Sequence, residues 1–226
     1  LMVDAPRFQL TGQRAEADSV RGGCATTLAQ RVRRGKRSAI GIHGFEQGGL
    51  LLEAGQATPE AIGPLIARAD WPREWKIVLV APPEREGLSG IAETHAFQRL
   101  SPMSEGLTAR LCRTILLELF PAVIEQDFSA ASAALWDYGK AVGEYFLPVQ
   151  QGLFADARMS RLVDQLRHQG ITGIAQTSWG PTIAILRESM ASAESLAAQL
   201  QHSGPWSDCI IKITTARNRG ADCHEA

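Results

Sequence analysis

The sequence of 226 residues predicts an α+β fold in which helices cover one face of a mainly antiparallel sheet. Three patterns from residue 76 onward lead to this prediction. The run KIVLVAPP, at residues 76–83, is a buried strand that two prolines end. The segments ITGIAQTS and TIAILRE, at residues 171–178 and 182–188, are paired strands around a Trp-Gly-Pro turn. Helical patterns fill the chain between the first strand and this pair.

The helix predictions follow from apolar spacing and from end signals. Residues 107–126 are expected to form an amphipathic helix, whose apolar face contains Leu107, Leu111, Ile115 and Leu116. Two more helices are expected over residues 127–145 and 157–169, and Gly170 would end the second of them. A last helix over residues 192–201 leads into a final strand at residues 209–216.

The first part of the chain contains shorter elements. Residues 11–23 are polar and contain glycine, which indicates a loop. A short helix over residues 27–34 should be followed by a second one, for which Ser38 is a suitable N-cap because its hydroxyl can accept from a first-turn amide. Gly48 and Gly49 then turn the chain into a strand at residues 50–52.

The overall composition is that of an ordinary globular protein. With 45% hydrophobic residues and a net charge of −1, the chain has no general attraction for nucleic acid or for an anionic membrane. No apolar run approaches the roughly 20 residues that cross a bilayer, and the opening LMVDAPRFQL does not resemble a signal peptide. Four separated cysteines without a CxxC pair suit a reducing cytoplasm.

The motif RRGKRSAIG, at residues 33–41, is the main candidate for an anion site. Backbone amides at a helix start that glycines flank point outward together, and guanidinium and ammonium groups add positive charge. The expected ligand is a phosphate or pyrophosphate, and the expected binding residues are Arg33, Arg34, Lys36, Arg37, Ser38 and Gly41. The alternative is a solvated basic loop.

The motif QTSWGPT, at residues 176–182, is a second candidate site. Small hydroxyl residues and a Gly-Pro corner let a ligand approach the backbone, and a tryptophan offers a flat face to an aromatic ring. The candidate residues are Ser178, Trp179, Gly180 and Thr182. The alternative is a tight hairpin turn with a tryptophan that serves in packing.

Isolated polar residues supply the remaining candidates. His43 and His95 could each act as a general base, since imidazole titrates near neutral pH, although single histidines are commonly structural. Glu46 and Glu53 could hold Mg²⁺ near the phosphate site, or they could be surface carboxylates. The motif ARNRGA, at residues 216–221, could close over an anion or could be a polar tail.

Five motifs together resemble one enzyme family. In chain order, RGKRSAIGIHGFEQGG, GLSGIAETHAF, PVQQGLF, QTSWGPT and ARNRGA resemble motifs of β-ribofuranosylaminobenzene 5′-phosphate synthases. These enzymes belong to the wider superfamily of galactokinase, homoserine kinase, mevalonate kinase and phosphomevalonate kinase. The resemblance extends from about Thr27 to Ala221. Residues 11–26 (TGQRAEADSVRGGCAT) stand where the family's glycine-rich nucleotide loop is expected, which suggests an incomplete or shortened chain.

The resemblance implies a fold, a reaction and partners. The fold would be a partial ribosomal-protein-like α+β domain at residues 1–70 and a ferredoxin-like α/β sandwich at residues 71–226. The reaction would condense 5-phosphoribosyl 1-pyrophosphate with 4-hydroxybenzoate or 4-aminobenzoate, with release of CO2 and pyrophosphate. This step belongs to the biosynthesis of methanopterin-type one-carbon cofactors. A cytoplasmic homodimer that uses Mg²⁺ is expected.

The resemblance also assigns residues to roles. The implied catalytic residues are His43, Glu93 and His95, with Glu46 at the metal. In addition to the basic-loop and hairpin candidates, the implied substrate-binding residues are Gln150, Arg217, Asn218 and Arg219. A non-catalytic remnant that binds phosphate or dimerises is one alternative. A small-molecule kinase of the superfamily is another, but Gly41-Ile42-His43 stands where such kinases have Gly-Ile-Asp.

Overall fold

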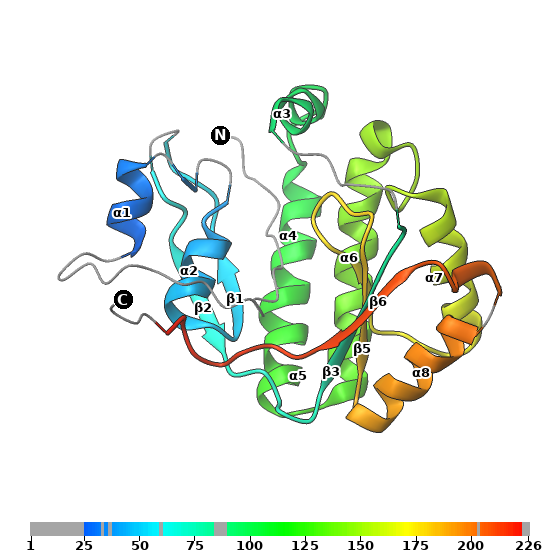
Figure 1. Cartoon of the computed structure of the whole chain (residues 1–226). Coiled ribbons are helices and arrows are strands. Elements are labelled where there is room, and N and C mark those ends of the chain that lie inside the picture. Colours follow the sequence, from blue (N-terminus) through cyan, green and yellow to red (C-terminus); the bar gives the residue numbers. More distant parts are fainter. Residues whose placement is uncertain are drawn as a thin grey trace. The chain divides into compact units, whose positions relative to one another are not determined.

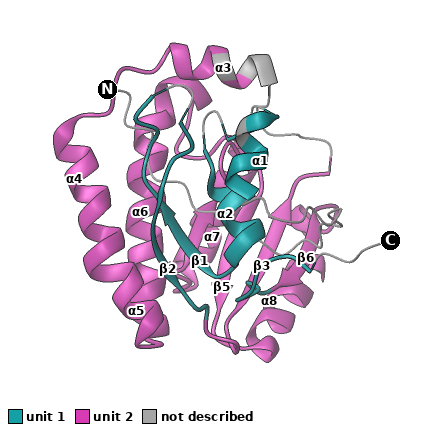
Figure 2. Cartoon of the chain, turned by 90° about the vertical axis from the view of Figure 1, so that its left-hand side faces the viewer, with its two compact units in different colours: residues 1–71, 215–226 teal, residues 72–214 magenta. Residues whose placement is uncertain are grey.

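The structure is a computed structural model, and it describes residues 25–222 except 33, 36–37, 59–60, 84–89 and 203. By internal contacts the chain forms two compact units (Figures 1 and 2). The first contains Leu1–Trp71 together with Thr215–Ala226, and the second contains Pro72–Thr214. The last residues of the chain are therefore grouped with the first part of it and not with the strand that precedes them.

The first unit contains two short helices and a two-stranded antiparallel sheet. Its elements are α1 (Ala25–Arg31), α2 (Ile40–Gln47), β1 (Leu50–Glu53) and β2 (Leu65–Ala69). Leu50 of β1 pairs with Ala69 of β2. Gly49 has a φ of 84°, which a residue with a side chain rarely adopts, so the predicted turn into β1 needs glycine here. Strand β1 was predicted, whereas β2 was not.

The second unit is built on a four-stranded antiparallel sheet. Its strands are β3 (Lys76–Ala81), β4 (Ile174–Gln176), β5 (Ile183–Arg187) and β6 (Ile210–Thr214), in the spatial order β4-β5-β3-β6. Val78, in the central strand β3, pairs with Ile185 on one side and with Ile213 on the other. The predicted hairpin of β4 and β5 is confirmed. The succession of strands and helices is the β-α-β-β-α-β order of a ferredoxin-like unit.

Helices account for most of the second unit. They are α3 (Gly90–Gln98), α4 (Glu105–Arg113), the π-helix η1 (Thr114–Leu119), α5 (Phe120–Ile124), α6 (Phe128–Gln150), α7 (Ala157–His168), α8 (Met190–His202) and the 3₁₀-helix η2 (Gly204–Trp206). One face of the sheet, with Val78, Ile183 and Ile185, packs against α7 and α8 in a single hydrophobic core. None of the helices in the described part of the chain combines the length and the apolar composition that crossing a membrane requires.

Helices lie on both faces of this sheet, not on one face as the sequence predicted. Ala175 and Leu186 point away from the core that α7 and α8 form, because neighbouring residues of a strand face opposite sides. A Cβ at Gly139 of α6 would lie 3.3 Å from the Cβ of Ala175. A Cβ at Gly173 would lie 2.8 Å from Ser132 Oγ of α6 and 2.9 Å from Leu186 Cβ. Helix α6 therefore covers the second face.

The predicted helix over residues 107–126 contains a π-helical turn that alters its apolar face. Leu111 and Ile115 are buried as predicted, but Leu116 is 45% exposed. The amide of Phe120 bonds to the carbonyl of Ile115, five residues earlier, which adds a residue to the turn and rotates the following side chains. The prediction for Leu116 was wrong because a strict α-helical period was assumed.

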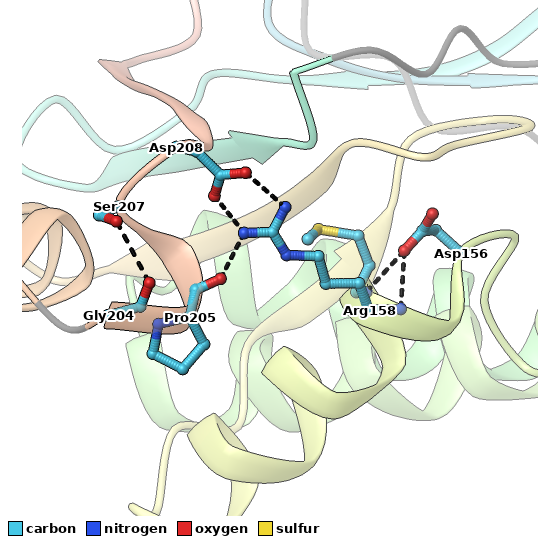
Figure 3. Close-up of polar contacts among 7 residues, drawn as sticks. Asp156, Arg158, Gly204, Pro205, Ser207 and Asp208 are labelled. Carbon is cyan, nitrogen blue, oxygen red and sulfur yellow. Dashed lines mark hydrogen bonds and ion pairs between the residues drawn. The ribbon is translucent and has the colours of Figure 1, made fainter.

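Helix α7 is tied at its start to the loop before β6. The buried carboxylate of Asp156 caps the helix, accepting from Arg158 N at 2.7 Å and from Met159 N at 3.0 Å. The guanidinium of Arg158 binds both carboxylate oxygens of Asp208 and the carbonyl of Pro205 (Figure 3). It also lies over the ring of Trp206, 5.7 Å from the centroid.

Candidate functional site

The start of α2, which was predicted to bind an external anion, holds a carboxylate of the protein itself. Glu53, at the end of β1, is 8% exposed. Ala39 N donates to both of its oxygens at 2.8 Å, and Ser38 Oγ donates to Oε2 at 2.8 Å. The negative group that a helix start attracts is thus already present. A phosphate at this end of the helix would have to rely on the basic side chains.

Ser38 is not the N-cap of α2. Ala39 occupies that position without a side-chain bond, and the Ser38 hydroxyl accepts from Ile40 N at 3.2 Å. The carboxylate of Glu53 takes over the role that a capping side chain would have. It comes from a strand 14 residues away, so the local sequence around Ser38 could not show it.

The basic loop before α2 is described in part. Arg33, Lys36 and Arg37 lie outside the described residues, and Arg34 is exposed. The side-chain amide of Gln56 donates to the carbonyl of Gly35 at 2.7 Å and to that of Ala61 at 2.6 Å. The loop between β1 and β2 therefore holds the backbone of the basic loop. Gln56 was not predicted to matter, because nothing in its own neighbourhood marks it.

His43 lies inside α2 and is buried, with 5% exposure. Its Nε2 is 2.8 Å from the carbonyl oxygen of Gly63. Because a carbonyl oxygen only accepts hydrogen bonds, Nε2 carries the proton and donates. In this arrangement His43 fastens α2 to the segment before β2, and Nε2 is not available to take a proton. Gly41, on the same helix, is exposed.

Glu46 and the segment after β6 meet at the other end of α2. Glu46 Oε1 accepts from Ala25 N at 2.7 Å. The amide of Ala221 donates to Phe45 O at 2.7 Å, and Gly49 N donates to Arg217 O at 2.6 Å. Among the described residues, no group of three or more His, Cys, Asp or Glu side chains could hold a metal ion. Glu46 is thus not part of such a group in that part of the chain.

Arg217 and Arg219 share one carboxylate. Arg217 Nη2 lies 2.6 Å from Asp222 Oδ2, and Arg219 Nη1 lies 2.8 Å from Asp222 Oδ1. Asn218, between them, donates from Nδ2 to Trp71 O at 2.8 Å and accepts at Oδ1 from Trp71 N at 2.7 Å. Asn218 thus has a structural function. In this structure the two arginines contact a carboxylate of the protein itself, and their predicted contact with a substrate stays a prediction.

The two cationic groups of the first unit lie at opposite ends of α2. The basic loop precedes this helix of 8 residues, and the arginine segment contacts its last turn and the residues after it. At the usual rise per residue, the ends of such a helix are about 12 Å apart. Among the described predicted binding residues of this unit, Arg34, Ser38 and Gly41 therefore lie at or near the start of α2, whereas the segment of Arg217 and Arg219 contacts its end.

In the second unit, Trp179 is packed among aromatic rings. It is 6% exposed and makes edge-to-face contacts with Phe97, at 5.1 Å between centroids, and with Phe146, at 4.7 Å. Its Nε1 donates to Glu93 Oε1 at 2.9 Å. The packing alternative thus describes Trp179 in this structure. Glu93, a predicted catalytic residue, holds that ring, while His95 on the same helix is exposed.

The turn beside Trp179 is held by a glutamine pair. Gln176 Oε1 accepts from Ala155 N at 2.6 Å, and its Nε2 donates to Ser178 O at 3.1 Å and to Gln150 Oε1 at 3.3 Å. Gly180 has a φ of 61°, and a Cβ there would lie 2.8 Å from the Gln176 side chain. The structure therefore brings together Gln150, Ser178, Trp179, Gly180 and Glu93 from the predicted list.

Comparison with known sequences finds related proteins over most of the chain. The chain is 30% identical over 214 residues to the β-ribofuranosylphenol 5′-phosphate synthase of Methanothermobacter thermautotrophicus, covering 87% of this chain and 61% of that protein. It is 28% identical over 209 residues to the enzyme of the same name from Archaeoglobus fulgidus, covering 86% of this chain and 63% of that protein. The predicted resemblance is confirmed. No family model matches the chain.

Solved structures share the fold at low sequence identity. MDDEF in complex with MVAPP, AMPPCP and magnesium has a TM-score of 0.60 at 17% identity, over 91% of this chain and 62% of that one. Mevalonate diphosphate decarboxylase from Enterococcus faecalis has a TM-score of 0.57 at 17% identity, over 88% and 60%. Mevalonate-3-kinase from Thermoplasma acidophilum has a TM-score of 0.56 at 12% identity, over 81% and 55%. The chain therefore shares the α+β fold of these proteins.

The chain spans 61% to 63% of the length of these two synthases. What they catalyse is therefore a hypothesis for this chain. The residues that sequence reasoning missed are Gln56, Phe97, Phe146, Gln176 and Asp222. Gln176 stood at the start of the hairpin motif, where its position before a Trp-Gly-Pro turn could have singled it out. Gln56, Phe97 and Phe146 make contacts with residues that are distant in the sequence. Asp222 looks like an ordinary surface carboxylate in the sequence, so its pairing with two arginines was not expected.

Proposed function

We propose that this chain carries the chemistry of a β-ribofuranosylphenol 5′-phosphate synthase. The observation that carries the proposal is 30% identity over 87% of the chain to a protein of that name. The name specifies a phenol product, which 4-hydroxybenzoate gives when it loses its carboxylate. 4-Aminobenzoate would give an aniline. We therefore propose 4-hydroxybenzoate as the aromatic substrate and 5-phosphoribosyl 1-pyrophosphate as the ribosyl donor.

The proposed reaction forms one single bond and breaks two. The ring carbon that bears the carboxylate forms a bond with C1 of the ribose, and the bond from C1 to the pyrophosphate oxygen breaks. The bond from the ring to the carboxylate then breaks, its electron pair restores the aromatic ring, and CO2 leaves. The balance requires no oxidant and no net proton. The enzyme has to stabilise the departing pyrophosphate and an electron-poor ribose carbon.

We propose that the basic loop stabilises the negative charge of the departing pyrophosphate. Arg34 is exposed before α2, and Arg33, Lys36 and Arg37 complete the basic sequence. Guanidinium groups bind phosphate oxygens in pairs and remain charged at any working pH. Glu53 cannot be the carboxylate of a metal site while it caps α2. It holds the loop from which the cations extend.

A base near the para hydroxyl would raise the electron density of the ring. Of the two candidate histidines, His95 is exposed, while His43 donates its Nε2 proton to Gly63. We therefore propose His95 for this function and a positioning function for His43. Gln150, Ser178 and Thr182, beside the β4–β5 turn, are proposed to contact the aromatic substrate.

Mg²⁺ is proposed to bind the pyrophosphate group of the donor. A protein of the same fold is known in complex with AMPPCP and magnesium. The described carboxylates of this chain do not gather into a metal site, and Mg²⁺ is commonly held by one or two carboxylates together with substrate phosphates. The family resemblance implies Glu46 for that contact, and since Glu46 lies near the end of α2 away from the basic loop, this role requires the pyrophosphate to extend toward that end. We also propose a cytoplasmic homodimer that acts in methanopterin-type cofactor synthesis, as the family resemblance implies.

The decisive experiment is an assay of the purified chain with 5-phosphoribosyl 1-pyrophosphate, Mg²⁺ and 4-hydroxybenzoate labelled in its carboxylate. We expect labelled CO2 and pyrophosphate in equal amounts, and little CO2 from labelled 4-aminobenzoate. Arg37→Ala should weaken binding of the ribosyl donor by about tenfold or more, since it removes a charged hydrogen-bonding group. Arg161→Ala, at an exposed position of α7, is the matched control.

Three outcomes would contradict the proposal or a part of it. Binding of the donor without release of CO2 would favour the alternative of a non-catalytic, phosphate-binding module. Transfer of phosphate from ATP would favour a kinase. Equal activity of Arg37→Ala and Arg161→Ala would remove the basic loop from the site.

A further inference from the structure

We propose that Arg217 and Arg219 form a binding site for a small oxyanion, and that Asp222 closes this site when no ligand is present. The carboxylate of Asp222 places one oxygen on each guanidinium, at 2.6 Å from Arg217 Nη2 and at 2.8 Å from Arg219 Nη1. A carboxylate or phosphate ligand that bridges the same two groups would make the same contacts. Asp222 therefore occupies the position of a ligand.

The backbone of this segment is fixed independently of the ion pairs. Arg217 O accepts from Gly49 N at 2.6 Å, and Ala221 N donates to Phe45 O at 2.7 Å. Asn218 bonds to both backbone groups of Trp71. The backbone positions of the two arginines are thus fixed on the first unit. Removal of the Asp222 carboxylate would leave these backbone positions in place, so a ligand would have to order only the two side chains.

The exposure of the three side chains allows exchange of the carboxylate for a ligand. The relative exposure of the Arg217 side chain is 26%, that of Arg219 is 71% and that of Asp222 is 40%. Exposed ion pairs are weak, so a ligand with two oxygens can displace the carboxylate. Glu53 differs, because it is 8% exposed and caps a helix. Of the two internal carboxylates at predicted anion sites, Asp222 is the one that can be displaced.

A competing internal group reduces the apparent affinity to the intrinsic affinity multiplied by the fraction of molecules in which that group is not bound. Asp222→Asn keeps the size of the side chain and removes its charge. We expect this variant to bind an oxyanion about tenfold more tightly than the unchanged chain. Asp164→Asn is the matched control, because it removes the same charge from an exposed position of α7 in the second unit. The control should bind as the unchanged chain does.

The measurement is isothermal titration calorimetry of the full chain with two separate probes, inorganic pyrophosphate and 4-hydroxybenzoate. If Asp222→Asn raises the affinity for pyrophosphate alone, the site binds phosphate. If it raises the affinity for 4-hydroxybenzoate alone, the site binds carboxylate. In both cases Arg217→Gln/Arg219→Gln should abolish the gain when combined with Asp222→Asn. Asp222→Ser, which also removes the carboxylate, serves as a second variant if Asp222→Asn does not fold.

Two results would overturn the inference. One is equal affinity of the Asp222→Asn and Asp164→Asn variants for both probes. The other is a gain that persists in the combined arginine variant, since the anion would then bind elsewhere. This inference deepens the proposed function, because the two probes are a product and a substrate of that reaction. It requires no turnover, so a chain without synthase activity can still confirm it.

Discussion

Glu53 is a buried carboxylate that two hydrogen-bond donors at the start of α2 stabilise. Ala39 N and Ser38 Oγ both donate to it at 2.8 Å. A charge with 8% exposure is costly to bury unless such donors compensate it. The same bonds connect the end of β1 with the end of the basic loop. Loss of the carboxylate should therefore affect the folded state and the predicted anion site together.

Glu53→Ala should lower the free energy of unfolding by about 2–3 kcal/mol, because an amide and a hydroxyl lose their acceptor in a buried position. Glu53→Gln keeps one acceptor oxygen and should lower it by about half as much. Urea unfolding followed by circular dichroism would measure both. Glu118→Ala is the control, since that side chain is 42% exposed and lies 3.7 Å from Arg113. A change at Glu53 no larger than at Glu118 would contradict the capping function.

At the level of residues, the sequence identified the types of group but not their partners. It indicated that the arginines of ARNRGA could close over an anion, but it did not show that they pair with the carboxylate of Asp222. It could not show that Glu53 caps α2 or that Glu93 bonds to Trp179, 86 residues away. Local patterns report charge and size, whereas such contacts depend on the folded chain.

The ion pair between Arg158 of α7 and Asp208 of the loop before β6 should make the stability of the protein depend on pH. The hydrogen bond from Arg158 lowers the pKa of Asp208 below its ordinary value. A lowered pKa in the folded state means that the carboxylate adds stability above the pKa of the unfolded chain, about 3.9. That contribution is lost as the pH falls through the lower pKa of the folded state.

The difference in unfolding free energy between the unchanged chain and Asp208→Asn should therefore be largest near neutral pH and should disappear in acid. Urea unfolding at a series of pH values from 7 downward would show it. Asp164→Asn, at an exposed position of α7, is the control for the loss of a charge. An effect of Asp208→Asn that does not change with pH would mean that the asparagine disturbs the loop in some other way.

At the level of elements, long periodic segments were predicted well and short mixed ones were not. Strands β3, β5 and β6 and helices α6, α7 and α8 appear where apolar spacing indicated them. Strand β2 was missed because its sequence, LIARA, is short and contains two alanines, which are not typical of strands. Its isoleucine is exposed in the structure. Helix α3 was missed because it begins directly after a glycine- and serine-containing stretch that resembles a loop. The π-helical turn leaves no mark in a spacing pattern.

For the whole molecule, the decisive property is that the second unit has a complete core of its own. Its sheet buries Val78, Ile183 and Ile185 against α7 and α8, and α6 covers the other face. Its two ends lie side by side, since Ile77 near the start of β3 pairs with Thr214 at the end of β6. A cut before Pro72 and after Thr214 therefore opens no gap in the sheet.

We expect the fragment of residues 72–214 to fold by itself and to unfold in one cooperative transition in urea. Leu162→Ala, at a fully buried position of α7, should destabilise the fragment by about 2–5 kcal/mol. Leu117→Ala, at a position that is 62% exposed, should change its stability by less than about 0.5 kcal/mol. A fragment that binds a hydrophobic dye and unfolds without a transition would show that the second unit depends on the first. Equal effects of the two substitutions would mean that α7 is not part of the core.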